Sequence, residues 1–242
     1  MIPLDRPLVI GHRGFPSRAV ENTLPSFEAA LAAGAAGIEC DVRATRDGAL
    51  VVFHDESLQR LCGVRGRIED LTADAVRSLS FVGAPAGLRI PPLEDVLELA
   101  RERDACALVE IKAEPTAPPE LARMAIAAVE RTRTHDRVAF LSFSHAAVAG
   151  LREIAPSMTS GRIFEDAPPS DAFAHGATGW VVLSADAATE PVVARLRALG
   201  QTVACYGVDD EAIDDRLDAA GVGLRIGNFP DVLVAKRSTV AR

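Results

Sequence analysis

The sequence lacks the features of disulfide-bonded, secreted and membrane-spanning proteins. The first ten residues, MIPLDRPLVI, contain no basic stretch followed by a long apolar run, so we expect no signal peptide. No uncharged apolar stretch reaches the roughly 18 residues that a membrane-spanning helix needs. The four cysteines form no CxxC pair and are scattered, and we expect reduced thiols in a cytoplasmic protein without stable membrane insertion. They are Cys40, Cys62, Cys106 and Cys205.

An excess of basic residues is also absent. The chain has 26 Lys and Arg residues against 34 Asp and Glu residues, which gives a formal net charge of −8. Proteins that bind nucleic acid need a basic surface to neutralise phosphate groups, so we expect no nucleic-acid partner. A small phosphorylated substrate needs only a local patch of positive charge, and it stays compatible with this composition.

Hydrophobic residues, in contrast, make up 48% of the 242 residues, enough for a sizeable core. This length suits one large α/β domain or two small ones. Short β-rich segments alternate with alanine-rich helical segments, a pattern that favours a parallel sheet or a (β/α)8 barrel. We predict a single domain over residues 1–242 with a TIM-like (β/α)8 barrel. The predicted strands are residues 8–12, 37–41, 50–54, 107–112, 138–142, 159–163, 180–183, 202–206 and 222–226.

Two segments do not fit a regular barrel. Nine predicted strands exceed the eight places of the barrel, and the eight residues between Asp41 and Leu50 are too few for a crossover helix, so we expect one surplus strand or a side hairpin there. Residues 56–90 are long and interrupted by Gly, Arg and Pro. We interpret them as an excursion over the barrel mouth after the third strand, inserted within the domain. The predicted helices are residues 24–33, 73–79, 93–102, 119–131, 146–154, 191–199 and 210–219, with caps at Asn22–Thr23, Thr72, Gly34, Gly200 and Gly221.

Ionisable residues stand at the ends of four predicted strands. Side chains alternate between the two faces of a strand, so Glu39 and Asp41 point the same way, as do Glu110 and Lys112. The C-terminal ends of barrel strands meet at one rim, where active sites lie. We therefore expect these residues to share one polar mouth. The converging set is His12, Arg13, Glu39, Asp41, His54, Glu110 and Lys112.

The converging set has a common chemical logic. Three carboxylates without cysteine or a close histidine pair suit one hard divalent cation, Mg²⁺ or Ca²⁺. Two histidines can serve as general acid and base near neutral pH. An arginine and a lysine can neutralise an anionic substrate. A single His or Glu at a strand end is ordinary, but this combination indicates metal-assisted phosphoryl chemistry.

In seven segments the chain resembles the glycerophosphodiester phosphodiesterase family, and the segments occur in the family's order. The resemblance implies a TIM-like barrel, one divalent cation, and hydrolysis of small-molecule glycerophosphodiesters to sn-glycerol 3-phosphate and an alcohol. By motif match it implies Glu39, Asp41 and Glu110 as metal ligands, His12 and His54 as the acid–base pair, and Arg13 and Lys112 as phosphate contacts. The segments are GHRG (11–14), ENTLPSFEAAL (21–31), GIECDVRATRDG (37–48), VVFHD (51–55), PPLEDVL (91–97), EIK (110–112) and SFS (142–144).

The C-terminal part departs from the family's pattern. Tyr206 stands where the family commonly has Trp, Asp209 where Asn follows, and Asn228 where Asp is usual. The resemblance places Tyr206 against the glycerol face, and we expect all three to shape the pocket for the glycerol or the head group. The acidic run DDEAIDD (209–215) mostly predicts a helix N-terminus, where the helix dipole favours negative charge.

Two alternatives to a glycerophosphodiesterase stay open at this point. A lysophospholipase D or a phospholipase C-like enzyme on the same scaffold should display apolar residues at the barrel mouth. Only LSFVGAPAGL (79–88) offers such a stretch, and a packed loop is its simpler interpretation. A non-catalytic binding protein could also keep the barrel, although the two histidines argue against it. The head group, the metal, the assignment of acid and base, and the oligomeric state, a homo-oligomer included, are left open.

Overall fold

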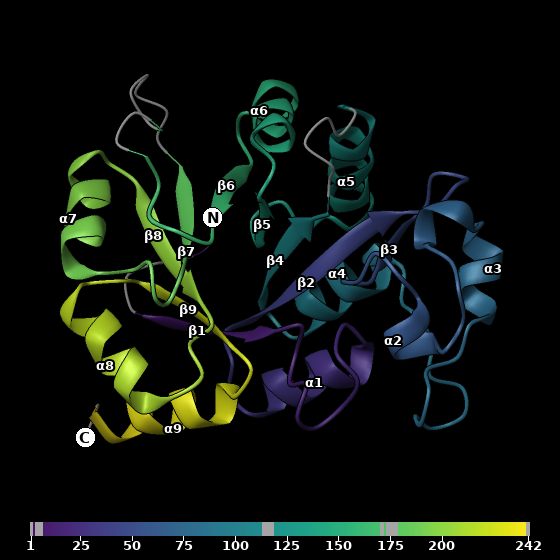
Figure 1. Cartoon of the computed structure of the whole chain (residues 1–242), viewed down its shortest axis with the longest axis horizontal. Coiled ribbons are helices and arrows are strands. Elements are labelled where there is room, and N and C mark those ends of the chain that lie inside the picture. The colour runs from purple at the N-terminus through teal and green to yellow at the C-terminus, as the bar shows by residue number, and fades with distance from the viewer. Residues whose placement is uncertain (1, 3–6, 113–118, 170–171, 173–178, 241–242) are drawn as a thin grey trace.

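Eight parallel strands close into a barrel in the computed structural model, which describes residues 2, 7–112, 119–169, 172 and 179–240 (Figure 1). The hydrogen-bonded order is β1-β9-β8-β7-β6-β5-β4-β2, and β1 pairs with β2 to complete the circle. The predicted TIM-like barrel is confirmed. Its strands are β1 (Leu8–His12), β2 (Gly37–Ala44), β4 (Cys106–Ile111), β5 (Val138–Ser142), β6 (Thr159–Phe164), β7 (Trp180–Ser184), β8 (Thr202–Tyr206) and β9 (Leu224–Gly227).

The surplus strand is β3 (Leu50–Val52), which lies outside the barrel. It pairs antiparallel with the end of β2, so the two form the expected side hairpin. The turn between them is closed by Thr45, whose hydroxyl donates to Asp47 over 2.7 Å and accepts the Ala49 backbone N–H at 2.9 Å. This hairpin extends β2 beyond the barrel and ends close to His54.

The helices surround the barrel (Figure 1). All seven predicted helices are present, and two further α-helices, α2 and α9, were not predicted. Only two residues, Asn228 and Phe229, separate the end of β9 from α9, which begins at Pro230. The α-helices are α1 (Leu24–Ala32), α2 (Gln59–Cys62), α3 (Ala73–Ser78), α4 (Leu93–Glu102), α5 (Pro119–Thr132), α6 (His145–Ile154), α7 (Glu190–Ala198), α8 (Glu211–Ala219) and α9 (Pro230–Val240).

The helix caps are partly as predicted. Thr72 caps α3 by accepting the Ala75 N–H, and glycines 34, 200 and 221 follow their helices with positive φ. Thr23 precedes α1, but its hydroxyl donates to the Val20 carbonyl over 2.6 Å and forms no cap. Asn22 is not a cap either, because its amide is engaged at the site described below. None of the described helices is long and apolar enough to cross a membrane.

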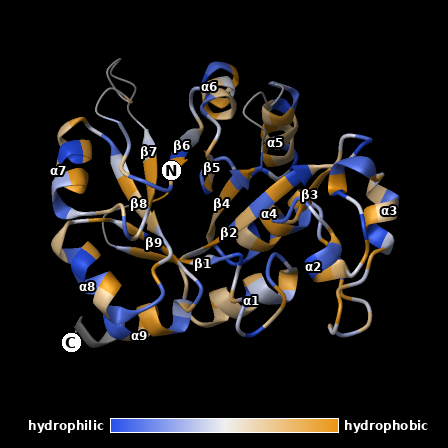
Figure 2. Cartoon of the chain, viewed as in Figure 1, coloured by the Kyte–Doolittle hydropathy of each residue, from blue (hydrophilic) through white to orange (hydrophobic). Residues whose placement is uncertain are grey.

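The barrel interior is polar only near one end. Strand alternation sends one row of apolar side chains inward, where they form a buried cluster, and the other row outward against the helices. Figure 2 shows hydrophobic strands inside a ring of helices with hydrophilic outer faces. The cavity described below is lined by residues at and near the C-terminal ends of the strands. The inward cluster includes Leu8, Ile10, Leu108, Leu141, Ile163, Val182, Leu224 and Ile226.

Residues 56–90 lie beside β2 and β3 in Figure 1 and contain α2, α3 and a short 3₁₀-helix, Ile68–Asp70. Their buried cluster includes Ile68, Val76 and Phe81, and it also takes in Val51 and Phe53 from the hairpin. Because this cluster is completed by residues outside the segment, we propose that residues 56–90 are an insertion within one domain.

Candidate active site at the barrel mouth

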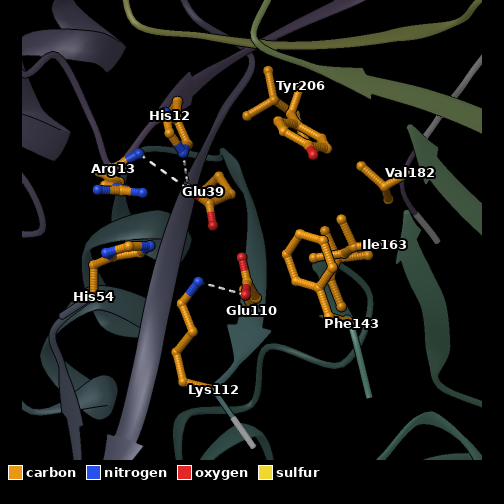
Figure 3. A pocket seen from close by; sticks show the side chains of 12 residues that line it. His12, Arg13, Glu39, His54, Glu110, Lys112, Phe143, Ile163, Val182 and Tyr206 are labelled. Carbon is orange, nitrogen blue, oxygen red and sulfur yellow. Dashed lines mark hydrogen bonds and ion pairs between the residues drawn. The ribbon is translucent and has the colours of Figure 1, made fainter. Parts of the chain in front are cut away.

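A cavity of about 190 Å³ opens at the C-terminal ends of the strands (Figure 3). One side is ionisable and the opposite side is apolar or aromatic, so the two ends of a bound molecule would meet different surroundings. Six of the seven converging residues line it, and the seventh, Asp41, is buried and is not among the lining residues. The lining residues are His12, Arg13, Glu39, His54, Glu110, Lys112, Leu141, Phe143, Ile163, Val182, Tyr206 and Ile226.

Three buried carboxylates form the floor of the ionisable side. Glu39 and Asp41 come from β2, and Glu110 comes from β4, where it pairs in register with Asp41. One oxygen from each lies within 4.8 Å of the others. Their exposed fractions are 4%, 1% and 8%, so water solvates them poorly. The parallel register between two neighbouring strands is what gathers them.

When all three carboxylates are ionised, they carry more negative charge than Arg13 and Lys112 neutralise. Burial and the neighbouring Asp41 raise the pKa of Glu39 to about 8 and that of Glu110 to about 7. Burial acts the same way on Asp41, but Lys112 and Arg13 outweigh it and hold the pKa of Asp41 at about 2. The Lys112 ammonium lies 2.9 Å from Asp41 Oδ1 and 2.5 Å from Glu110 Oε1. A hard divalent cation suits this donor set, because it would let all three groups ionise together.

The raised pKa values predict how the stability of the metal-free protein depends on pH. Glu39 and Glu110 hold protons more tightly when folded than at their ordinary value of 4.5. The stability that this adds is complete below pH 4.5 and is lost as pH rises towards 8. We expect the Tm of the metal-free protein to fall more between about pH 5.5 and about pH 8 than that of Glu39→Gln. Added Mg²⁺ should raise the wild-type Tm more at the higher pH.

Thermal unfolding followed by circular dichroism measures this difference. Glu98→Gln is the matched control, because it removes an exposed carboxylate of α4 and should keep the wild-type slope. Parallel Tm curves for wild type and Glu39→Gln over this pH range would contradict the prediction.

Arg13 lies in a backbone turn in which both it and Gly14 have positive φ angles. Its φ is 53° and that of Gly14 is 89°, and a side chain at position 14 would clash with Ser26 at 2.5 Å. This turn lets the Arg13 N–H donate to Glu39 Oε2 at 3.1 Å, while Nε lies 3.3 Å from Asp41 Oδ2. A left-handed non-glycine residue is strained, and such strain concentrates at functional sites.

Asn22 is a site residue that sequence reasoning interpreted only as a helix cap. It also has a positive φ, 58°, and only 2% of it is exposed. Its amide donates to Asp41 Oδ2 at 2.8 Å and accepts the Asp41 backbone N–H at 3.2 Å. Asn22 therefore holds one carboxylate in place. Its position inside the motif ENTLPSFEAAL was the available signal.

His54 is held by a chain of ion pairs that reaches the insertion. Its Nδ1 lies 2.9 Å from Asp55 Oδ1, and burial lowers the pKa of the ring although Asp41 acts to raise it. Asp55 accepts from Arg60 of α2 at 2.6 and 2.7 Å. Arg60 also donates twice to Glu21, which accepts from Arg13 at 2.8 Å. Arg60 thus links Asp55, the partner of His54, to Glu21, the partner of Arg13.

His12, at the end of β1, is supported by residues that follow the neighbouring strands β9 and β8. Its Nδ1 lies 2.8 Å from Asn228 Oδ1, and its Nε2 lies 3.9 Å from Glu39 Oε2. Burial, followed by Arg13, lowers the pKa of His12. Asn228 and Asp209 stand behind this ring and are not among the lining residues. Asn228 contacts His12, and Asp209 contacts Asn228. These contacts do not support the expected role of the two residues in shaping the pocket.

The apolar side is built by Phe143 and Tyr206 above a floor of aliphatic residues. The two rings pack edge to face, with centroids 6.5 Å apart, and 47% of Phe143 is exposed. Segment 79–88 contributes no lining residue: Phe81 is buried in the insertion, and Val82 is 65% exposed away from the cavity wall. Of the remaining histidines, His145 begins α6 and does not line the cavity, and His175 lies outside the described residues.

Comparisons with known proteins find relatives along nearly the whole chain. The model of the glycerophosphoryl diester phosphodiesterase family matches residues 12–232. A glycerophosphodiester phosphodiesterase of Bacillus altitudinis is 31% identical over 238 residues, covering 95% of this chain and 97% of that protein. One from Caldanaerobacter subterraneus subsp. tengcongensis is 35% identical over 162 residues, covering 65% and 67%.

Solved structures share the fold. The glycerophosphodiester phosphodiesterase of Agrobacterium tumefaciens C58 superposes with a TM-score of 0.80 at 28% identity, covering 96% of this chain and 99% of that one. An Oleispira antarctica phosphodiesterase, solved with its product sn-glycerol-3-phosphate, has a TM-score of 0.86 at 22% identity and covers 98% of both chains. The Agrobacterium tumefaciens and Oleispira antarctica structures therefore share the fold along nearly the whole length of this chain.

Proposed function

Because this chain belongs to the glycerophosphoryl diester phosphodiesterase family, we propose that it hydrolyses glycerophosphodiesters to sn-glycerol 3-phosphate and an alcohol. One observation carries the proposal: a single cavity joins a buried carboxylate cluster to two histidines. Both histidines have Nδ1 engaged by a partner, which leaves Nε2 of each available to a substrate. This is the arrangement that acid–base catalysis at a phosphodiester requires.

Glu39, Asp41 and Glu110 would hold one divalent cation, Mg²⁺ or Ca²⁺. When bound, the cation supplies positive charge that stabilises the phosphate oxygens as negative charge develops on them. Chelator-treated protein should therefore not hydrolyse glycerophosphocholine, glycerophosphoethanolamine or glycerophosphoinositol until one of these ions is added. Failure to hydrolyse any of the three with either ion would contradict the proposed function.

The two sides of the cavity would bind different parts of the substrate. Arg13 and Lys112 lie on the ionisable side, where their charges suit the non-bridging phosphate oxygens. Tyr206 and Phe143 present aromatic surface on the other side, suited to the carbon face of the glycerol. A lysophospholipid would need further apolar surface for its acyl chain, and segment 79–88 supplies none to the cavity. Glycerophosphodiesters without acyl chains are therefore the preferred substrates.

We propose that the glycerol 2-hydroxyl makes the first attack on phosphorus. One histidine takes the proton of this hydroxyl, and the other gives a proton to the leaving alcohol, so that a cyclic 1,2-phosphate forms. Water then opens the cyclic phosphate while the two histidines exchange roles, which returns both to their starting protonation. An internal nucleophile is already held close to phosphorus. This proximity can lower the activation barrier by about 7 kcal/mol at a modest effective molarity.

A substrate whose 2-hydroxyl is replaced by hydrogen tests this order of events. We expect the 2-deoxy diester to bind with a similar affinity and to release less than about 1% of the alcohol that the parent releases in the same time. Synthetic cyclic glycerol 1,2-phosphate should be opened by the enzyme, and ³¹P NMR follows both compounds. Hydrolysis of the 2-deoxy diester at the parent's rate would instead require direct attack by water.

A further inference from the structure

The side chains of His12, Asn228 and Asp209 form a hydrogen-bonded chain, and they come from distant parts of the sequence. Asp209 follows β8, Asn228 follows β9, and His12 ends β1, so the neighbouring strands β8, β9 and β1 deliver one residue each. Asn228 Oδ1 lies 2.8 Å from His12 Nδ1, and Asn228 Nδ2 donates to Asp209 Oδ2 at 2.8 Å. The second oxygen of Asp209 accepts the Asn228 backbone N–H at 2.7 Å.

The carboxylate determines the direction of the whole chain. An ionised carboxylate only accepts hydrogen bonds, so the atom of Asn228 that faces Asp209 must be the NH₂ group. The carbonyl oxygen of the same amide must then face His12. A carbonyl oxygen cannot donate, and Nδ1 of His12 must therefore carry the proton of the bond between them. In the neutral ring, Nε2 is left with its lone pair.

We propose that Asp209, acting through Asn228, is a positioning residue that fixes His12 in the tautomer whose Nε2 can accept a proton. His54 reaches the same result by a shorter route, because its Nδ1 bonds directly to the Asp55 carboxylate at 2.9 Å. Without Asp209 the Asn228 amide can rotate and present its NH₂ group to Nδ1. This would favour the other tautomer, whose Nε2 already bears a proton and cannot act as a base.

The role in catalysis rests on the proposed function, but the tautomer itself can be measured without substrate. Long-range ¹H–¹⁵N correlation spectra of the Mg²⁺-loaded, histidine-labelled protein distinguish the two neutral tautomers, and His12→Gln assigns the signals. We expect the proton of His12 on Nδ1 in the wild type and a shift towards Nε2 in Asp209→Ala. An inactive wild type with this tautomer would contradict the proposed function and leave the inference standing.

Steady-state kinetics test the consequence. We expect Asp209→Ala to lower kcat roughly tenfold with KM within about twofold, short of the ~10⁴-fold loss seen when a tautomer-fixing partner touches the histidine directly. The matched control is Asp210→Ala, which removes the neighbouring N-cap of α8, a bond of 2.8 Å to the Ile213 N–H. It should destabilise the protein without lowering kcat.

Exchanging the two side chains provides a rescue. In the double variant Asp209→Asn, Asn228→Asp, the new carboxylate can accept from His12 and from the new amide, so the same tautomer is enforced. It should recover most of the wild-type kcat, whereas Asn228→Asp alone places two carboxylates side by side. The inference is overturned if the wild type carries the proton on Nε2. It is also overturned if Asp209→Ala keeps both tautomer and kcat, or raises KM with kcat unchanged.

Discussion

Glu39→Gln and Glu110→Gln are each expected to lower kcat/KM by about 10³-fold or more. The carboxylates are the donors of the proposed cation site, and a bound cation contributes several kcal/mol of charge stabilisation in the transition state. Each variant keeps the size of the side chain and removes its charge. Metal affinity, measured by isothermal titration calorimetry with Mg²⁺, should weaken together with the rate.

The control for the metal ligands is Glu165→Gln. Glu165 is an exposed carboxylate just beyond β6, and burial of Tyr206 together with this neighbour raises the pKa of the phenol. The variant therefore removes the same charge near the cavity without removing a proposed ligand. If both Glu39→Gln and Glu110→Gln kept full activity after chelator treatment, the carboxylate cluster would not be the metal site.

Substitution of either histidine is expected to have the second largest effect. His12→Gln and His54→Gln should each lower kcat by about 10²–10⁴-fold, the range that a positioned general acid or base contributes. Metal affinity should stay within about twofold of the wild type, because neither ring is a proposed ligand. His145→Gln, which changes an exposed residue at the start of α6, should keep the wild-type rate.

A change of leaving group separates the two roles. Nitrophenol leaves readily without receiving a proton, so a nitrophenyl ester of glycerol phosphate does not need the general acid in the first step. We expect the variant of the acid to regain most of its rate on this substrate and the variant of the base to stay slow. If neither variant gained on the nitrophenyl ester, protonation of the leaving alcohol by a histidine would be ruled out.

The insertion contributes to the site indirectly. Arg60 lies on α2, and its guanidinium pairs with both Asp55 and Glu21. Through them the insertion orients His54 from one side and Arg13 from the other. Its buried cluster, which includes Phe53 next to His54, holds the same segment in place. The hairpin and the insertion that interrupt the regular barrel thus support one of the two proposed catalytic histidines.

The barrel and the converging residues could be predicted from the sequence because both depend on local patterns. Side chains alternate between the two faces of a strand, so in GIECD Glu39 and Asp41 share one face, and in ALVEIK Glu110 and Lys112 share one face. This holds independently of the tertiary structure. Parallel strands joined by helices must all end at the same rim, so the residues at those ends had to approach one another. The surplus strand was also predictable, since too few residues separate β2 from β3 for a crossover helix.

Only the tertiary structure decided which side chains form hydrogen bonds to the converging residues. Asn22 is of a residue type that often caps helices, yet its amide donates a hydrogen bond to the Asp41 carboxylate. Asp209 begins an acidic run that does start a helix, but Asp210 caps it while Asp209 binds Asn228. The bond between His12 and Asn228 joins residues 216 positions apart. Such contacts arise when β9 closes the barrel against β1, and no local pattern encodes which side chains then meet, because that depends on strand register and side-chain orientation across the closed sheet.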